Sequence, residues 1–186
     1  MRIIGGNFRG KKLNLPKNKL TRPLKDIVKE SIFNLILHSK EIDIIIKNSL
    51  ILDLFSGSGS FGIECISREA KKVTFIENYS EAIKILEKNL NSLKNTNNYQ
   101  ILNCDVLNFF SQNKKLDLKF DLIFIDPPYR EKRINEIIEI ILEKQILSLN
   151  GIIIIHRHKK DIVQITSKLK ILEERTYGIS KILLGK

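Results

Sequence analysis

The stretch from Leu50 to Gly62 constrains the fold more than any other part of the sequence, because an apolar run leads directly into a glycine-rich turn. Residues 50–55 are apolar apart from Asp53, as expected of a strand buried on both faces of a parallel sheet. The next ten residues contain three glycines. This junction predicts a strand, a turn that holds a ligand, and a helix that begins near Ser60.

Each of the three glycines has a predicted role. Gly57 is expected to take a positive φ, Gly59 has no Cβ to block an approaching ligand, and Gly62 lets the helix pack close to the strand. Free N–H groups at the start of the helix would then face a polar group of the ligand. The spacing also matches the G-x-G-x-x-G pattern of dinucleotide-binding proteins, and glycine turns occur as plain connections, so the pattern is weak by itself.

A second motif narrows the choice of ligand. Residues 120–125 (FDLIFI) predict another buried strand, which runs into Asp126, Pro127, Pro128 and Tyr129. The two prolines remove two N–H donors and fix two φ angles, so the loop is stiff and presents acceptors, a carboxylate and an aromatic ring. Acceptors beside a ring suit a flat base that carries an amino group. A plain strand stop is the alternative interpretation of the Pro-Pro pair.

Composition and charge indicate a soluble protein with a polyanionic partner. The hydrophobic fraction is 42% and the charged fraction 28%, which is typical of globular chains. No apolar run approaches the roughly 20 residues of a membrane span, and no signal peptide begins the chain, so we expect a cytoplasmic protein. Two cysteines and three histidines show no metal-ligand spacing, so we expect no metal. The net charge of +11 favours nucleic acid.

The positive charge is concentrated near the N-terminus. Residues 1–30 carry nine basic and two acidic side chains, whereas the rest of the chain carries 23 and 19. Residues 2–5 and 11–15 predict a short hairpin, and an amphipathic helix is predicted to start at Arg22-Pro23. We therefore divide the chain into a basic extension, residues 1–40, and a main domain, residues 41–186. The alternative is that lysine is simply abundant in this chain.

The two motifs together carry a resemblance to a known family. The pair DLFSGSG and DPPY, in this order, resembles the class I S-adenosylmethionine-dependent methyltransferases that act on exocyclic amino groups. The start RIIGG and the segment TRP are further similar to the bacterial small-subunit ribosomal RNA guanine-N2 methyltransferase family, and the match covers nearly the whole chain. The resemblance implies S-adenosylmethionine as cofactor and 16S ribosomal RNA as substrate, in an assembled or assembling subunit. We expect a monomer.

The order of predicted elements agrees with that fold class. Strands at 50–55, 72–76, 99–102, 120–125 and 151–155 alternate with helices, which predicts parallel pairing with right-handed crossovers. Two further strands are predicted around a turn at Tyr177-Gly178. A closing hairpin suits the Rossmann-like, seven-stranded, mostly parallel methyltransferase sheet better than a plain dinucleotide fold. The fold class expected is therefore α/β, with helices on both faces and a small N-terminal extension.

The resemblance also assigns roles to individual residues. It implies that Asp126 and the Pro127 carbonyl accept the two N–H bonds of the target amine while Tyr129 stacks on the base. The cofactor would be bound by residues at the ends of the first three strands, and the RNA by basic residues of the extension. The implied cofactor residues are Asp53, Phe55, Gly57, Gly59, Glu77, Asp105 and Val106, and the implied RNA residues are Arg2, Arg9, Lys11 and Arg22.

Several alternatives stay open at this point. Glu77 could be a solvated acid instead of a ribose ligand, and Asp105 could be a helix N-cap, a cofactor ligand or both. The acceptor could be adenine N6 in DNA or a protein glutamine amide, and a non-catalytic RNA-binding assembly factor is a further possibility. A nicotinamide dehydrogenase is disfavoured by DPPY. His156, which follows the fifth predicted strand, is assigned no role.

Overall fold

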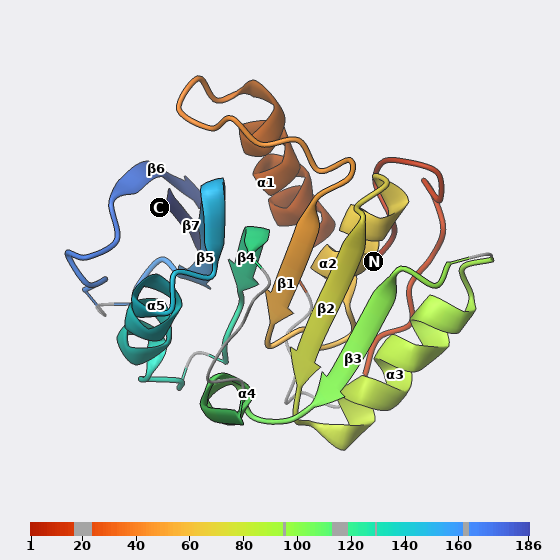
Figure 1. The fold of residues 1–186 in the computed structure, drawn as a ribbon. Coiled ribbons are helices and arrows are strands. Elements are labelled where there is room, and N and C mark those ends of the chain that lie inside the picture. Colours follow the sequence, from red (N-terminus) through yellow and green to blue (C-terminus); the bar gives the residue numbers. More distant parts are fainter. Residues whose placement is uncertain (17–23, 95, 113–118, 129, 162–163) are drawn as a thin grey trace.

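The computed structural model describes residues 1–16, 24–94, 96–112, 119–128, 130–161 and 164–186, and within them it forms one seven-stranded sheet (Figure 1). The strand order is β3-β2-β1-β4-β5-β7-β6. Strands β3, β2, β1, β4 and β5 pair in parallel, whereas β7 is antiparallel to both of its neighbours. The strands are β1 (Leu50–Leu54), β2 (Lys72–Glu77), β3 (Tyr99–Asn103), β4 (Phe120–Ile125), β5 (Leu147–His158), β6 (Ile171–Tyr177) and β7 (Ser180–Gly185).

Helices cover both faces of this sheet (Figure 1). Alternate residues of a strand point to opposite faces, so Leu122 and Phe124 of β4 join one apolar cluster, and Ile123 and Ile125 join the other. The first cluster contains α1, α2 and α3, and the second contains α4 and α5. The helices are α1 (Asp26–His38), α2 (Ser60–Ser67), α3 (Ser80–Asn91), α4 (Val106–Gln112) and α5 (Ile134–Glu143).

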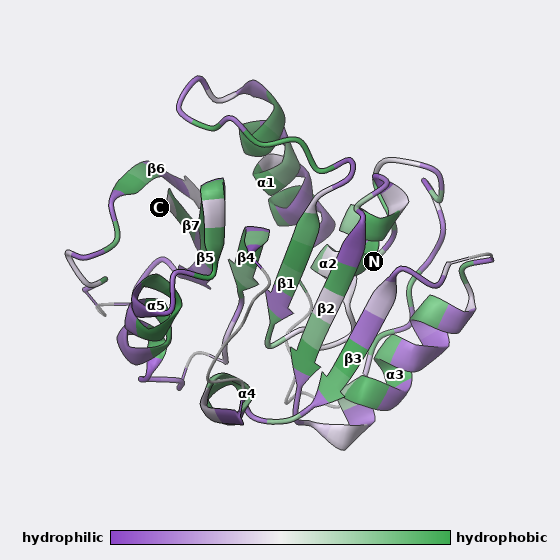
Figure 2. Cartoon of the chain, in the orientation of Figure 1, coloured by the Kyte–Doolittle hydropathy of each residue, from purple (hydrophilic) through white to green (hydrophobic). Residues whose placement is uncertain are grey.

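The apolar runs of the sequence form the centre of the sheet. Figure 2 shows hydrophobic residues along β1, β2 and β4 and a mixture of hydrophobic and hydrophilic residues around α3. Phe61 of α2 stacks between Phe33 of α1 and Phe124 of β4, with ring centroids 5.3 and 4.0 Å away. These three aromatic rings therefore fix α1 and α2 against the middle of the sheet.

The N-terminal segment packs on α2. The predicted hairpin is present as a single antiparallel bridge between Arg2 and Lys12. The buried carboxylate of Glu64 in α2 accepts the N–H groups of Ile4 and Gly5, both at 2.8 Å. The N-terminal segment thus shares the apolar cluster of α1 and α2, and the functional division at residue 40 stays a prediction.

Two element boundaries differ from the sequence prediction. Helix α1 begins at Asp26 because Lys25 has the extended backbone of an N-cap, with ψ 143°, so the helix starts later than Arg22-Pro23 suggested. Strand β5 begins at Leu147, four residues before its predicted start, and its register against β4 shifts between Phe120 and Leu122.

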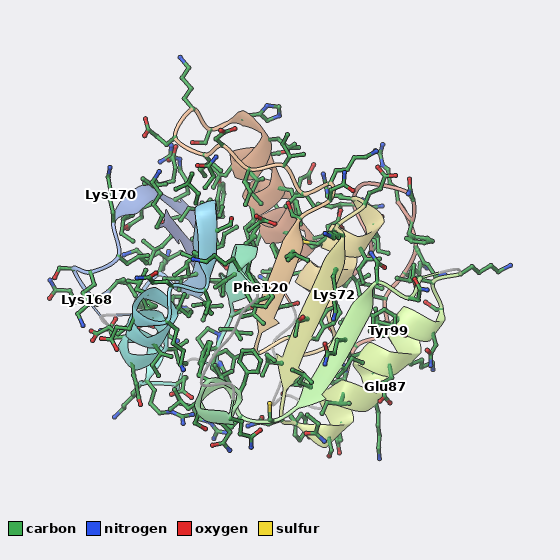
Figure 3. All side chains as sticks on the ribbon, viewed as in Figure 1. Lys72, Glu87, Tyr99, Phe120, Lys168 and Lys170 are labelled. Carbon is green, nitrogen blue, oxygen red and sulfur yellow. The ribbon has the colours of Figure 1, made fainter. Side chains whose placement is uncertain are left out.

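At the β6 end, Lys168 and Lys170 lie at the edge of the molecule (Figure 3). No helix among the described residues is long and apolar enough to cross a membrane.

Candidate active site

The predicted site residues meet at the edge formed by the carboxyl ends of the parallel strands. Leu54 pairs with Ile76 and Ile125, and Ile125 pairs with Ile155. The next residue of each strand therefore lies in one row across the sheet, as ligand residues do in open α/β folds. This row, which we call the site row, consists of Glu77, Phe55, Asp126 and His156.

The glycine turn is built as the sequence indicated, but for partly different reasons. Gly57 has φ +56°, and a Cβ added there would meet no atom within 4 Å, so this is the open position of the turn. Gly59 also has a positive φ, but its Cβ would lie 2.3 Å from Leu86 Cδ1. The absence of a side chain at Gly59 is thus required by packing inside the protein. Gly62 lets α2 pack closely on the sheet, but against β2 and not against the preceding strand β1 as predicted, since a Cβ would lie 2.3 Å from Phe75 Cε1.

Glu77 organises the turn around the open glycine. Its Oε2 accepts the Gly57 N–H at 2.7 Å, and its Oε1 accepts the N–H groups of Asn78 and Tyr79 at 3.0 and 2.9 Å. A carboxylate has about four acceptor positions, so one remains for a hydroxyl. Glu77 therefore links the glycine turn to the residues that precede α3 through hydrogen bonds. Its role as a ribose ligand stays a prediction.

Asp53 lies beneath the turn instead of on its surface. Its side chain is buried, and its Oδ2 accepts the Gly62 N–H at 2.9 Å. Burial raises the pKa of the Asp53 carboxyl well above its usual range, although the hydrogen bond from Gly62 opposes this shift. The sequence did not reveal this contact with α2. Binding of a cofactor amino group by Asp53 stays a prediction.

The end of β3 supplies the next group of predicted residues. Asp105 caps α4, with its Oδ1 accepting the Leu107 N–H at 2.9 Å, so the N-cap interpretation is confirmed. Its Oδ2 faces Arg133 Nη2 at 3.4 Å. A small pocket beside this cap brings together three predicted cofactor residues, Phe55, Glu77 and Val106, and its full lining is Phe55, Ile76, Glu77, Asn78, Cys104 and Val106. The lining is apolar apart from Glu77 and Asn78, and the cavity itself is far smaller than a nucleoside.

At the end of β4, Asp126 contacts His156, a residue to which its sequence context assigned no role. Its Oδ1 lies 2.8 Å from His156 Nδ1. The His156 side chain is 1% exposed and the Asp126 side chain 20% exposed, so the histidine stands behind a carboxylate that reaches the surface. Pro127 is buried, and Tyr129 lies outside the described residues. The signal that could have found His156 is its position. It follows Ile155 at the end of one predicted strand, just as Asp126 follows Ile125 at the end of another.

The predicted RNA residues are spread along the N-terminal segment. Arg2 and Arg9 are exposed, while Lys11 Nζ donates to the Ser92 carbonyl at the end of α3. The turn that carries Arg9 contacts Ser67, at the opposite end of α2 from the glycine turn. An RNA contact at Arg9 would therefore be separate from one at Asp126. Arg22 lies outside the described residues.

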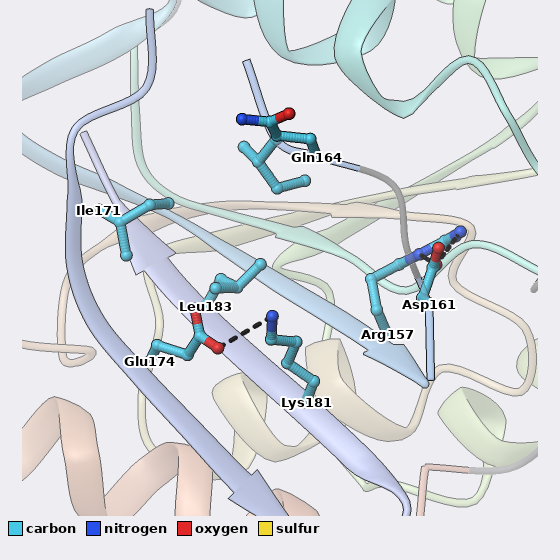
Figure 4. A pocket seen from close by; sticks show the side chains of 8 residues that line it. Arg157, Asp161, Gln164, Ile171, Glu174, Lys181 and Leu183 are labelled. Carbon is cyan, nitrogen blue, oxygen red and sulfur yellow. Dashed lines mark hydrogen bonds and ion pairs between the residues drawn. The ribbon is translucent and has the colours of Figure 1, made fainter. Parts of the chain in front are cut away.

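A further pocket lies on the sheet face opposite His156, between β5, β6 and β7 (Figure 4). At one end Arg157 pairs with Asp161, and near the other Lys181 Nζ pairs with Glu174 Oε1 at 2.9 Å. These opposite charges neutralise each other. The pocket contains no residue of the site row.

The strand order and the antiparallel β7 define the class I S-adenosylmethionine-dependent methyltransferase fold. Within that class, the chain belongs to the family described as conserved hypothetical protein 95, whose model matches residues 1–186. The family resemblance seen in the sequence is confirmed.

Individual relatives match over most of their length. Ribosomal RNA small subunit methyltransferase D of Haemophilus influenzae is 35% identical over 180 residues, which cover 96% of this chain and 90% of the relative. A Bacillus subtilis protein, named provisionally as an rRNA methyltransferase, is 33% identical over 187 residues, covering 100% and 98%. A solved Haemophilus influenzae protein, described provisionally as a methylase, has a TM-score of 0.76 at 36% identity, covering 99% and 96%.

Proposed function

We propose that this protein transfers a methyl group from S-adenosylmethionine to the exocyclic N2 amino group of a guanine in small-subunit ribosomal RNA. The observation that carries the proposal is the site row, where the Asp126 carboxylate lies beside an open glycine turn on neighbouring strands. The rRNA methyltransferase names of the relatives support the substrate class. A cytoplasmic location follows from that substrate.

The residues of the glycine turn and the pocket fit the proposed cofactor. Gly57 leaves open space where a ligand can approach the backbone. Phe55 and Val106, which line one small pocket with Glu77, would offer apolar contacts to an adenine ring, and Glu77 would accept ribose hydroxyls. The bound cofactor supplies a methyl group already activated by a sulfonium. The protein therefore has to orient an acceptor nitrogen and needs no nucleophile of its own.

Asp126 would act on the acceptor nitrogen. The lone pair of a guanine N2 is delocalised into its ring, so acceptors must draw the N–H bonds into a geometry that frees it. Asp126 and the carbonyl of Pro127 each accept one N–H, and positive charge that develops on the nitrogen is stabilised by the carboxylate. Tyr129 is proposed to stack on the base. A base inside folded RNA would have to be unpaired or flipped to reach this edge.

The test is transfer of radiolabelled methyl to small subunits that lack this modification. The wild-type protein is expected to label the RNA, and Asp126→Ala is expected to abolish labelling while leaving S-adenosylmethionine affinity largely intact. Asp43→Ala is a matched control because Asp43 is exposed and precedes β1, whose opposite end leads into the site row. Equal loss of methylation and cofactor binding in Asp126→Ala would show that Asp126 has been misassigned. Label in DNA or protein instead of RNA would contradict the proposed substrate.

A further inference from the structure

The end of β5 places a buried histidine directly behind the proposed catalytic carboxylate. His156 and Asp126 follow the paired residues Ile155 and Ile125, so they are neighbours on the same face of the sheet. On its other side, His156 pairs with Ile182 of β7, which is fully buried. His156 thus lies on a strand flanked by β4 and β7, and because its side chain is only 1% exposed, packing restricts rotation of the imidazole.

The hydrogen bond makes the two oxygens of Asp126 different. A carboxylate that takes up the amine proton must be ionised, and an ionised carboxylate only accepts hydrogen bonds. We therefore assign His156 Nδ1 as the donor and Asp126 Oδ1 as the acceptor of the 2.8 Å contact. The Asp126 backbone holds the residue weakly, because its N–H reaches the Leu54 carbonyl only at 3.5 Å. The histidine is thus the side-chain partner that holds the carboxylate, and with Oδ1 engaged, Oδ2 would be the oxygen that meets an acceptor amine.

Arg157, the residue after His156, contacts the far end of the segment from Asp126 to Glu131 that follows β4. Arg157 points to the opposite face of β5, is 3% exposed, and its Nη2 lies 3.4 Å from the Glu131 carbonyl. His156 therefore holds the loop where it leaves β4, and Arg157 contacts it five residues later. Pro127 and Pro128 lie between these points and restrict the backbone further. Two consecutive residues of β5, His156 and Arg157, thus contact this part of the chain at Asp126 and at Glu131.

We propose that His156 is a positioning residue that fixes the Asp126 carboxylate for methyl transfer to an amine; the proposal rests on the proposed function. In that step the amine lone pair forms the N–C bond while the S–C bond breaks. The electron pair of the S–C bond stays on sulfur, which becomes a neutral thioether. The nitrogen then loses a proton to Asp126 Oδ2, from which it passes to water. His156 keeps its own Nδ1 proton throughout and touches no reacting atom.

Three substitutions separate positioning from general support of the fold. His156→Asn places an amide N–H near the position of Nδ1, His156→Gln carries it further from the backbone, and His156→Ala removes it. We expect kcat to fall about 10- to 100-fold in His156→Ala and His156→Gln, and His156→Asn to recover most of that loss. The KM for RNA and the Kd for S-adenosylhomocysteine should change little in all three variants.

Several outcomes would overturn the proposal. If His156→Asn were no more active than His156→Gln, the Nδ1 donor would have no role, and the comparison stands even if His156→Ala fails to fold. If His156→Gln and Asp126→Asn had additive effects on kcat, the two residues would act independently. Parallel loss of S-adenosylhomocysteine binding would indicate a structural role only.

A spectroscopic measurement tests the geometry without any activity. Long-range ¹⁵N NMR on histidine-labelled protein should show His156 as the Nδ1-protonated form, and Asp126→Ala should change that signal. An Nε2-protonated His156 with an unprotonated Nδ1 would refute the donor assignment. This measurement also separates the two proposals: a wild-type protein that labels no RNA contradicts the proposed function, whereas the tautomer of His156 still tests the positioning inference.

Discussion

Replacing Glu64 with Gln should release the N-terminal segment from α2. The Glu64 carboxylate is fully buried and accepts four donors, namely the N–H groups of Ile4 and Gly5 at 2.8 Å, Arg68 Nε at 3.0 Å and Lys29 Nζ at 3.5 Å. A glutamine has one acceptor oxygen where the glutamate has two. At least one backbone N–H would therefore face an amide NH₂ group, which is itself a donor.

The expected magnitude follows from two losses. Hydrogen bonds to a charged acceptor contribute about 1.5–3 kcal/mol each, and one of the two from Ile4 and Gly5 is lost. The Lys29 ammonium, whose side chain is also fully buried, keeps only the Arg2 carbonyl and Ser60 Oγ as neutral partners. Breaking a buried ion pair on one side costs about 3–5 kcal/mol. We expect a total loss of about 3–5 kcal/mol because the two losses overlap.

Urea unfolding followed by circular dichroism measures this loss, and hydrogen exchange at the Ile4 and Gly5 amides localises it. Glu69→Gln is the matched control, since Glu69 pairs with Lys47 on the exposed surface, and its unfolding curve should overlap that of the wild type. Adding Lys29→Met to Glu64→Gln should restore stability, because it removes the unpaired buried charge. A Glu64→Gln protein as stable as the wild type, or a double variant less stable than the single one, would refute the reasoning.

Three further predictions concern the glycine turn and the RNA. The pKa of Asp53 is raised in the folded protein, so its contribution to stability is full below the unfolded pKa of about 3.9 and is lost as the pH rises through the raised pKa. In urea titrations the free energy of unfolding of Asp53→Asn should therefore rise relative to that of the wild type between acidic and neutral pH. A difference in unfolding free energy that does not change with pH would contradict this. Gly62→Ala should lower the free energy of unfolding by about 1–3 kcal/mol through its clash with Phe75, which a thermal melt equal to that of the wild type would exclude. Arg22→Ala should weaken RNA binding more than cofactor binding and reduce the salt dependence by about one phosphate contact; an unchanged RNA affinity would remove Arg22 from the interface.

The sequence predicted those parts of the fold that local patterns determine. The apolar run before Gly57 and the turn itself specify β1, the positive φ and the start of α2 at Ser60. The hairpin around Gly178 likewise follows from a turn residue between two strand-like runs. These features depend on residues that are near one another in the chain, so a single sequence contains them.

The remaining features depend on contacts between distant residues. Gly59 is required by Leu86, which comes from α3, and Asp53 is buried because α2 turns back over β1. His156 had no visible role because its partner Asp126 is 30 positions away, and only the register of β4 against β5 brings them together. Sequence patterns indicate which strands are present, but their mutual register is set by packing across the sheet.

The most direct test of the central claim is nucleoside analysis of RNA digested after labelling by the wild-type protein. The proposed function predicts that the labelled methyl group is recovered as N2-methylguanosine from small-subunit RNA, and that the Asp126→Ala protein yields none. Label recovered in another nucleoside, or in a protein of the subunit, would contradict the assignment of the acceptor, even if transfer from S-adenosylmethionine were efficient.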